Sequence, residues 1–259
     1  MTPKSLFDVT GKTALITGGS RGLGLQMAEA LGSHGARLVL SARKADELQR
    51  AQAHLHKLDI DVDWVAADVA HDADIASLSD AVLEKLGRVD ILVNNAGTSW
   101  GAPAEDYPAA AWDKVFNLNI RGVFLLTQQI GKRSMIPNQY GRIINIASIA
   151  GLRGNPPGPM QTIAYNSSKA ALINFTRTLA GEWGRHGITV NALAPGFFPS
   201  KMSQGAIDML GEKALIGNAP LQRLGDAQDL KGATLLFASD AGKHITGQVL
   251  AVDGGYTAV

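Results

Sequence analysis

Cysteine is absent from this 259-residue sequence, so disulfides, thiolate catalysis and cysteine zinc sites are excluded. An excess of either charge is absent too, because 24 Lys and Arg stand against 23 Asp and Glu, for a net charge of +1. Without a basic run, this balance argues against nucleic acid and anionic membrane surfaces as partners. The six histidines show no paired metal-ligand spacing, so we expect no metal site.

Long apolar runs and a secretory signal are also missing. No segment approaches the roughly 20 apolar residues that span a bilayer, and the first eleven residues lack the apolar core of a signal peptide. These absences favour a cytoplasmic protein. Hydrophobic residues make up 46% and charged residues 18%, as in ordinary globular chains. Because no repeat or linker divides the sequence, it predicts a single domain over residues 1–259.

Short β-branched runs alternate with longer amphipathic segments. Strands are predicted at 12–17, 37–41, 62–66, 89–93, 142–147, 188–192 and 248–252. Helices are predicted at 21–33, 45–57, 72–86, 111–132, 164–184 and 227–238. Continuous apolar strands are typical of parallel sheets that are covered on both faces. The fold class expected is therefore α/β: a doubly wound, Rossmann-type parallel sheet of about seven strands, with helices on both faces and ligands at the carboxyl ends of the strands.

A glycine-rich loop follows the first predicted strand and leads directly into a helix. It reads Thr17-Gly18-Gly19-Ser20-Arg21-Gly22-Leu23-Gly24. Such a loop lets the backbone approach a pyrophosphate closely, and the helix N-terminus then offers free N–H groups to it. The spacing G-x-x-x-G-x-G differs from the commoner G-x-G-x-x-G fingerprint, and a purely structural turn is the alternative interpretation.

The end of the second predicted strand bears on the choice between the two nicotinamide cofactors. An acid there would bind the ribose hydroxyl and repel a phosphate, but Ala42 occupies that place and Arg43 follows it. Arg43 and Arg21 are suited to clasp a 2′-phosphate. This favours NADP(H) over NAD(H), unless both arginines are solvated surface charges. Asp68, after the third strand, is either an acceptor for the adenine amine or a helix cap.

Four polar residues would act together if the chain moves a hydride. Tyr165 and Lys169 share one face of a predicted helix, Ser148 follows the fifth strand, and Asn119 lies in the long helix after the fourth. Hydride delivery to a carbonyl leaves an alkoxide that needs a proton, and a neighbouring ammonium lowers the pKa of a tyrosine toward this task. A serine hydroxyl polarises the carbonyl. Taken one at a time, the residues have ordinary alternatives. Tyr165 and Lys169 also fit a surface pair, Ser148 a cap at a strand end, and Asn119 an amide that faces solvent.

The motifs and their order resemble the short-chain dehydrogenase/reductase family over nearly the whole chain. Beside the glycine loop, Asn119 and Ser148, the matching pieces are Asp68-Val69, Asn94-Asn95-Ala96-Gly97, Tyr165-Asn166-Ser167-Ser168-Lys169 and Pro195-Gly196. The resemblance implies that Tyr165 is the general acid/base and that Ser148 binds the substrate oxygen. It also implies that Lys169 lowers the pKa of Tyr165 and holds the nicotinamide ribose. Asn119 would then hold a water that relays protons to Lys169.

Further cofactor contacts are implied by the same resemblance. The adenine-ribose side of the cofactor would be lined by Asn95, Ala96 and Gly97, with Asp68 and Val69 beside the adenine. The nicotinamide would meet Pro195, Gly196 and the backbone of Phe198. Ser200 stands where the family often has threonine against the carboxamide or phosphates. A homotetramer is expected by analogy alone.

Substrate identity is the least determined feature. The chain looks most like NADP-dependent reductases of 3-oxoacyl thioesters, which reduce a ketone to a secondary alcohol, and a substrate lid is expected at about 197–224. Apolar lid residues fit an acyl portion, whereas Lys201 is a candidate partner for an acidic group. Sugar-acid enzymes of the gluconate 5-dehydrogenase kind are the alternative, since they use the same machinery. A non-catalytic NADP(H) sensor or scaffold is a third reading. The loop at 153–162 either borders the substrate or is a surface insertion.

Overall fold

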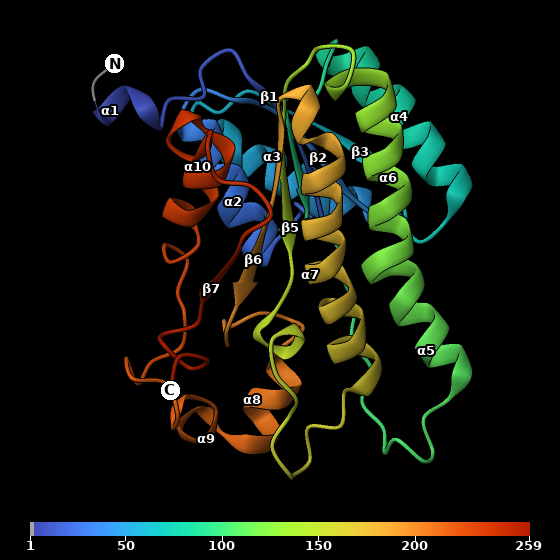
Figure 1. Ribbon diagram of the computed structural model, residues 1–259, viewed down its shortest axis with the longest axis vertical. Coiled ribbons are helices and arrows are strands. Elements are labelled where there is room, and N and C mark those ends of the chain that lie inside the picture. Colours follow the sequence, from blue (N-terminus) through green and yellow to red (C-terminus); the bar gives the residue numbers. More distant parts are fainter. Residues whose placement is uncertain (1–2) are drawn as a thin grey trace.

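A parallel sheet runs through the centre of the protein (Figure 1). The computed structural model describes residues 3–259, with side chains from Ser5 onward, and this part of the chain contains seven strands in the order β3-β2-β1-β4-β5-β6-β7. The strands are β1 (Thr13–Thr17), β2 (Arg37–Ala42), β3 (Val62–Ala66), β4 (Ile91–Asn94), β5 (Gly141–Ile146), β6 (Ile188–Pro195) and β7 (Val249–Val252). All neighbouring strands pair in parallel. The predicted doubly wound fold is confirmed.

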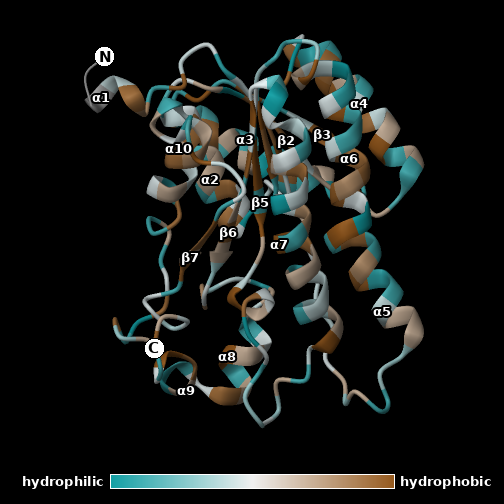
Figure 2. Cartoon of the chain, in the orientation of Figure 1, coloured by the Kyte–Doolittle hydropathy of each residue, from teal (hydrophilic) through white to brown (hydrophobic). Residues whose placement is uncertain are grey.

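Helices cover both faces of the sheet because successive strand residues point to opposite sides. Ile16 of β1 packs with α2 (Gly22–Ser33), α3 (Ala45–His56) and α10 (Lys231–Ala238). Its neighbour Leu15 packs with α4 (Asp72–Leu86), α6 (Val123–Ile130) and α7 (Ile163–Trp183). The central strands are mostly apolar, whereas the helices alternate apolar and polar residues (Figure 2). Burial on both sides is what selects a parallel sheet.

The long helix predicted at 111–132 is interrupted rather than continuous. It begins with α5 (Ala109–Phe116), widens into a π turn at η1 (Asn117–Gly122), continues as α6 and widens again at η2 (Gly131–Met135). The helix passes so close to the loop after β3 that a Cβ on Gly122 would lie 2.0 Å from Val69 O. Only glycine permits this approach, and the wide turn carries Asn119 toward the site.

Most other boundaries fall within two residues of those predicted, and two differ by more. β6 continues to Pro195, three residues past its expected end, because it stays in register with β7 up to the pair Pro195 and Val252. The helix predicted at 227–238 begins only at Lys231, since Asp226 and Asp229 bond backbone N–H groups of a preceding turn. The region at 197–224, expected as a lid, contains α8 (Gln204–Leu210) and α9 (Glu212–Ile216).

Short helical turns complete the described chain. They are α1 (Pro3–Leu6), η3 (Ile149–Gly151), η4 (Gly184–His186) and η5 (Asp240–Gly242). Within residues 3–259, every helix is too short or too polar to cross a bilayer. The same residues hold no group of three His, Asp or Glu side chains arranged as metal ligands.

Candidate active site

The chemically important residues gather at the carboxyl edge of the sheet. Ser148 lies two residues after β5 ends, Asn95 directly follows β4, and Pro195 is the last residue of β6. Tyr165 and Lys169 come from the first two turns of α7, which contacts the turn that contains Ser148. The parallel strands therefore bring together residues from distant parts of the sequence, at the edge where this fold binds ligands.

Lys169 is buried and points under the tyrosine. Its side chain is only 4% exposed, and its Nζ donates to Ile146 O at 2.7 Å. Nζ also lies 5.7 Å from the centre of the Tyr165 ring. Burial lowers the pKa of Lys169 to about 8, because a buried ammonium loses its hydration. With one donor used on the strand, the remaining N–H groups are available to ribose hydroxyls.

Ser148 and Tyr165 form the second half of the reactive group. The Ser148 Oγ accepts from the Ala150 N–H at 3.1 Å and so caps η3, which fixes the hydroxyl in position. Burial raises the pKa of Tyr165, and its hydrogen bond with Ser148 opposes this to a lesser degree. The expected lowering of this pKa is therefore wrong for the protein without cofactor, because the loss of phenolate hydration dominates. The phenol stays protonated at neutral pH.

Asn119 fastens the loop after β4 to α7. Its Oδ1 accepts from the Thr98 N–H at 2.8 Å, and its Nδ2 donates to Thr98 O at 2.9 Å and to Ser168 Oγ at 3.0 Å. A Cβ built on Gly97 would lie 3.4 Å from Asn119 Oδ1 and 3.5 Å from Lys169 Nζ. Both N–H groups of the amide are thus used inside the protein, so a relay water would have to bond to an oxygen of Asn119.

The loop between β1 and α2 fits a pyrophosphate. Gly18 has a φ of +64°, and a Cβ on Gly24 would lie 2.3 Å from Gly18 O, so the loop and helix meet at backbone contact. Arg21 precedes α2 and makes no side-chain cap, which leaves the first N–H groups of the helix without a side-chain acceptor. An open glycine turn beside a free helix N-terminus is the geometry that binds phosphates.

Asn95, directly after β4, forms hydrogen bonds with the start of this loop. Its Nδ2 donates to Thr17 O at 2.9 Å and to Gly18 O at 3.1 Å. In return, Thr17 Oγ1 accepts from the backbone N–H groups of Asn95 at 3.0 Å and Ala96 at 3.1 Å. The Asn95 side chain therefore braces the glycine-rich loop, and the predicted cofactor contacts of Asn95, Ala96 and Gly97 stay predictions.

Both arginines predicted to hold a 2′-phosphate are paired with acids. Arg21 Nη1 lies 2.9 Å from Glu47 Oε1, and Ser20 Oγ lies 3.4 Å from the other oxygen of that carboxylate. Arg43 Nη1 lies 3.9 Å from Asp68 Oδ2. The two guanidinium groups remain exposed enough to meet a ligand. Glu47 was missed by the sequence reasoning, although its place in the first turn of α3 was a usable signal.

Asp68 is not the helix cap that one interpretation of the sequence proposed. The residue before α4 is His71, which makes no side-chain cap. The Asp68 Oδ1 accepts instead from the Ala70 N–H at 3.1 Å, within the turn that leads to the helix. Its other oxygen faces Arg43, so the side chain joins the exposed end of the proposed adenosine site. Val69 is buried beside it, at 6% exposure.

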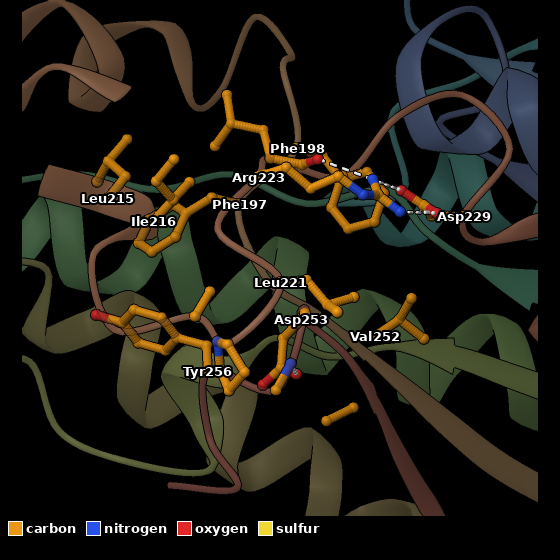
Figure 3. Close-up of a pocket in the computed structure, with 17 residues that line it drawn as sticks. Phe197, Phe198, Leu215, Ile216, Leu221, Arg223, Asp229, Val252, Asp253 and Tyr256 are labelled. Atoms are coloured by element: carbon orange, nitrogen blue, oxygen red, sulfur yellow. Dashed lines mark hydrogen bonds and ion pairs between the residues drawn. The ribbon is translucent and has the colours of Figure 1, made fainter. Parts of the chain in front are cut away.

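A cavity of about 190 Å³ opens beside the reactive group. Ser148 and Tyr165 line it, together with Ser200, Met202 and Ala206 of the region at 197–224. The loop at 153–162 contributes a wall as well, which favours a border of the substrate site over a surface insertion. A neighbouring cavity of about 420 Å³ lacks both catalytic side chains and is separated by Phe197 and Tyr256, which line both (Figure 3).

The remaining predicted site residues lie near these two cavities or outside them. Gly196 approaches the C-terminal segment so closely that a Cβ would lie 2.8 Å from Asp253 Cα. Phe198 is buried, lines the larger cavity and accepts at its carbonyl from Ser203 Oγ at 2.5 Å. Lys201 is exposed and lines neither cavity. A contact between Lys201 and substrate stays a prediction.

A Rossmann-type sheet with a Ser-Tyr-Lys group at its ligand edge defines a nicotinamide-dependent oxidoreductase. A family model described as enoyl-(acyl carrier protein) reductase matches residues 18–257. The chain belongs to the short-chain dehydrogenase/reductase family, and the resemblance seen in its motifs is confirmed. Its cofactor is a nicotinamide dinucleotide, NAD(P).

Relatives named for two different kinds of substrate share similar sequence identities with this chain. Gluconate 5-dehydrogenase of Gluconobacter oxydans is 35% identical, over 99% of both chains. The rhamnolipid-biosynthesis 3-oxoacyl-[acyl-carrier-protein] reductase of Pseudomonas aeruginosa is 39% identical, over 96% of this chain and 98% of the relative. The crystal structure of a gluconate 5-dehydrogenase from Burkholderia cenocepacia, in complex with NADP and tartrate, superposes with a TM-score of 0.92 at 32% identity, over 98% of both chains.

Proposed function

We propose that the protein is an NADP(H)-dependent reductase that converts a ketone to a secondary alcohol. The observation that carries this proposal is the placement of Tyr165, which shares a cavity with Ser148 while its ring centre lies 5.7 Å from the Nζ of the buried Lys169. A neutral phenol is the form that donates a proton during reduction.

Each residue has a defined part in this reaction. When NADPH is bound, the hydride comes from its nicotinamide. Ser148 holds the carbonyl oxygen as negative charge develops there, and the Tyr165 Oη delivers the proton to that oxygen. Lys169, fixed by Ile146 O, holds the ribose and stabilises the phenolate that remains. Asn119 keeps the loop after β4 in contact with α7 and so maintains this arrangement.

NADP(H) is proposed over NAD(H) on electrostatic grounds. Ala42, at the end of β2, offers no carboxylate to the ribose, and the exposed guanidinium groups of Arg21 and Arg43 are available to a 2′-phosphate. Three similar proteins of known structure contain NADP, which agrees with this preference. Gly18, Gly22 and Gly24, with Leu23 at the start of α2, would hold the pyrophosphate.

A 3-oxoacyl thioester or a similar ketone is the first proposed substrate class. Ile149, Met160 and Met202 give the cavity apolar walls, and the reductase of Pseudomonas aeruginosa shares this chemistry by name. A sugar acid is the second candidate, favoured by the small volume of the cavity and by the gluconate relatives. A non-catalytic sensor is disfavoured, since a binding protein has no use for the intact Ser-Tyr-Lys-Asn set.

The location and assembly of the protein are also proposals. The family resemblance supports a homotetramer in the cytoplasm. The segment at 197–224 is proposed as the substrate lid, because Met202, Ser203 and Ala206 line the cavity that holds Tyr165. The whole chain of residues 1–259 is proposed to act as one catalytic domain.

The decisive experiment follows NADPH oxidation with an acetoacetyl thioester and with 5-keto-D-gluconate, in wild type and Tyr165→Phe. We expect the variant to lose about 10²- to 10⁴-fold in kcat, while its Kd for NADPH, measured by fluorescence, changes less than twofold. Turnover that survives in the variant would refute the role of Tyr165. A wild type that binds NADPH and reduces no ketone in a broad panel would favour the sensor instead.

A further inference from the structure

The catalytic cavity holds one formal positive charge, that of Arg153. Arg153 is the sole Lys, Arg, Asp or Glu among the residues that line this cavity. Its backbone N–H donates to Ile149 O at 3.2 Å, which ties it to the same short turn that Ser148 caps. A cation is therefore built into the segment that positions the catalytic serine.

This charge is held in place without being neutralised. The guanidinium carbon of Arg153 lies 4.9 Å above the centre of the Tyr256 ring, and Tyr256 is buried against Phe197, whose ring meets it edge-on at 5.7 Å. In the described part of the chain, no carboxylate lies within ion-pair distance of Arg153. Stacking on an aromatic ring orients a guanidinium and leaves its N–H donors free.

The larger cavity shows the opposite arrangement. Arg223 lines it, but its Nη1 lies 2.5 Å from Asp229 Oδ2, and both nitrogens of its fork are engaged (Figure 3). That pair lies away from Tyr256 in the view (Figure 3). The Arg223 side chain is thus already neutralised within the chain, whereas the Arg153 guanidinium remains available to an anion from outside it.

Most other polar side chains around the catalytic cavity already have partners. The Asn155 Nδ2 donates to Met160 O at 2.7 Å and to Thr162 Oγ1 at 3.0 Å, and its Oδ1 accepts from Asn166 at 3.1 Å. Ser200 and Ser203 bond to each other at 3.0 Å. The Arg153 guanidinium thus stands out on this wall as a donor without a partner in the described chain, and it suits a negative group on the substrate.

We propose that Arg153 binds the carboxylate of a compact oxo acid, whose ketone lies between Ser148 and Tyr165. The inference rests on the proposed reductase function and names its substrate class. The fork of a guanidinium matches a carboxylate with two parallel hydrogen bonds. A cavity of about 190 Å³ has room for a short acid beside Ser148 and Tyr165, whereas the charges of an acyl-carrier thioester lie at the far end of a long arm, outside it.

The test compares compact oxo acids of four to six carbons, 5-keto-D-gluconate among them, with the matching neutral amides. We expect wild type to reduce the acids with at least tenfold higher kcat/KM than the amides. Arg153→Gln should lose about 10- to 100-fold in kcat/KM for the acids and less than twofold for the amides. Arg153→Lys should fall between the two. Arg50→Gln, which removes an exposed arginine on α3 outside both cavities, is the matched control and should change neither value.

A binding measurement separates recognition from chemistry. With NADPH bound, gluconate forms a complex that cannot react, and its Kd is obtained from quenching of NADPH fluorescence. We expect Arg153→Gln to raise this Kd at least tenfold and to leave the Kd of NADPH unchanged. An acid preference that survives in Arg153→Gln, or a wild type that prefers amides or thioesters, overturns the inference while leaving the reductase function intact. A wild type that reduces no ketone at all overturns the function itself.

Discussion

At the scale of single residues, Lys169 combines a functional need with a cost in stability. It is buried, and its pKa falls from an ordinary 10.5 to about 8. Between these two values the unfolded chain binds more protons at this residue than the folded chain does. The contribution of Lys169 to stability therefore rises with pH across that window and is least favourable below pH 8.

Replacement by methionine, which does not titrate, exposes this dependence. We expect the difference in unfolding free energy between Lys169→Met and wild type to shift in favour of wild type by up to about 3 kcal/mol between pH 7.5 and 10.5. Urea unfolding at several pH values measures it. A difference that stays flat with pH would show that the folded ammonium keeps its ordinary pKa. Activity is lost in this variant at every pH, because the phenolate loses its neighbouring charge.

Arg21 is the residue on which coenzyme preference is expected to depend most. Glu47 already holds its guanidinium at 2.9 Å, on the proposed path of the 2′-phosphate. Arg21→Ala should weaken NADPH binding about tenfold or more, since a charge-assisted bond to the phosphate is lost, and should leave NADH binding within twofold. Fluorescence titration with both coenzymes measures this.

The control for that substitution is Arg37→Ala, at the other end of β2, where the side chain pairs with Asp61 instead. It should alter the affinity for neither coenzyme. Equal losses for NADPH and NADH in Arg21→Ala would mean that Arg21 supports the loop rather than the phosphate.

At the scale of elements, the junction of β1 and α2 tolerates no added atom at Gly24. A Cβ there would lie 2.3 Å from Gly18 O, so Gly24→Ala must push the helix from the loop. We expect a loss of about 1–3 kcal/mol in unfolding free energy, together with weaker NADPH binding. Chemical denaturation and fluorescence titration measure the two effects.

Gly181→Ala provides the matched control, because Gly181 lies within α7 and no atom stands within 4 Å of its would-be Cβ. There the same substitution should stabilise the helix by about 0.5–1 kcal/mol. If both alanine variants behave alike, the close contact at Gly24 is not what holds the loop.

Elements also show where sequence reasoning succeeded and where it stopped. Strands and helices came from periodicity, which depends on burial and is written into the residue order, so the sheet and α7 were predicted well. The π turn at Asn119 was not, because it arises from the approach of Gly122 to Val69 O, a contact between distant segments. The hydrogen bonds of the Asn95 side chain and the ion pair of Arg21 with Glu47 also join distant segments, so the structure was needed to establish them. Arg153 was overlooked since no motif contains it.

At the scale of the whole molecule, the proposed assembly is open to direct measurement. The chain has a mass of 27.2 kDa. Light scattering coupled to size exclusion should give four times that mass at micromolar concentration if the homotetramer is correct. A mass of one chain, with full activity in the same sample, would rule out assembly as a requirement for the site. Family analogy, rather than any contact within one chain, supports this expectation.

The amide of Asn95 has a consequence for how coenzyme is received. By donating to the successive carbonyls of Thr17 and Gly18, it ties the residue after β4 to the end of β1 without any bound nucleotide. The dinucleotide therefore binds a loop that is already ordered, so its binding free energy is not reduced by the cost of ordering that loop.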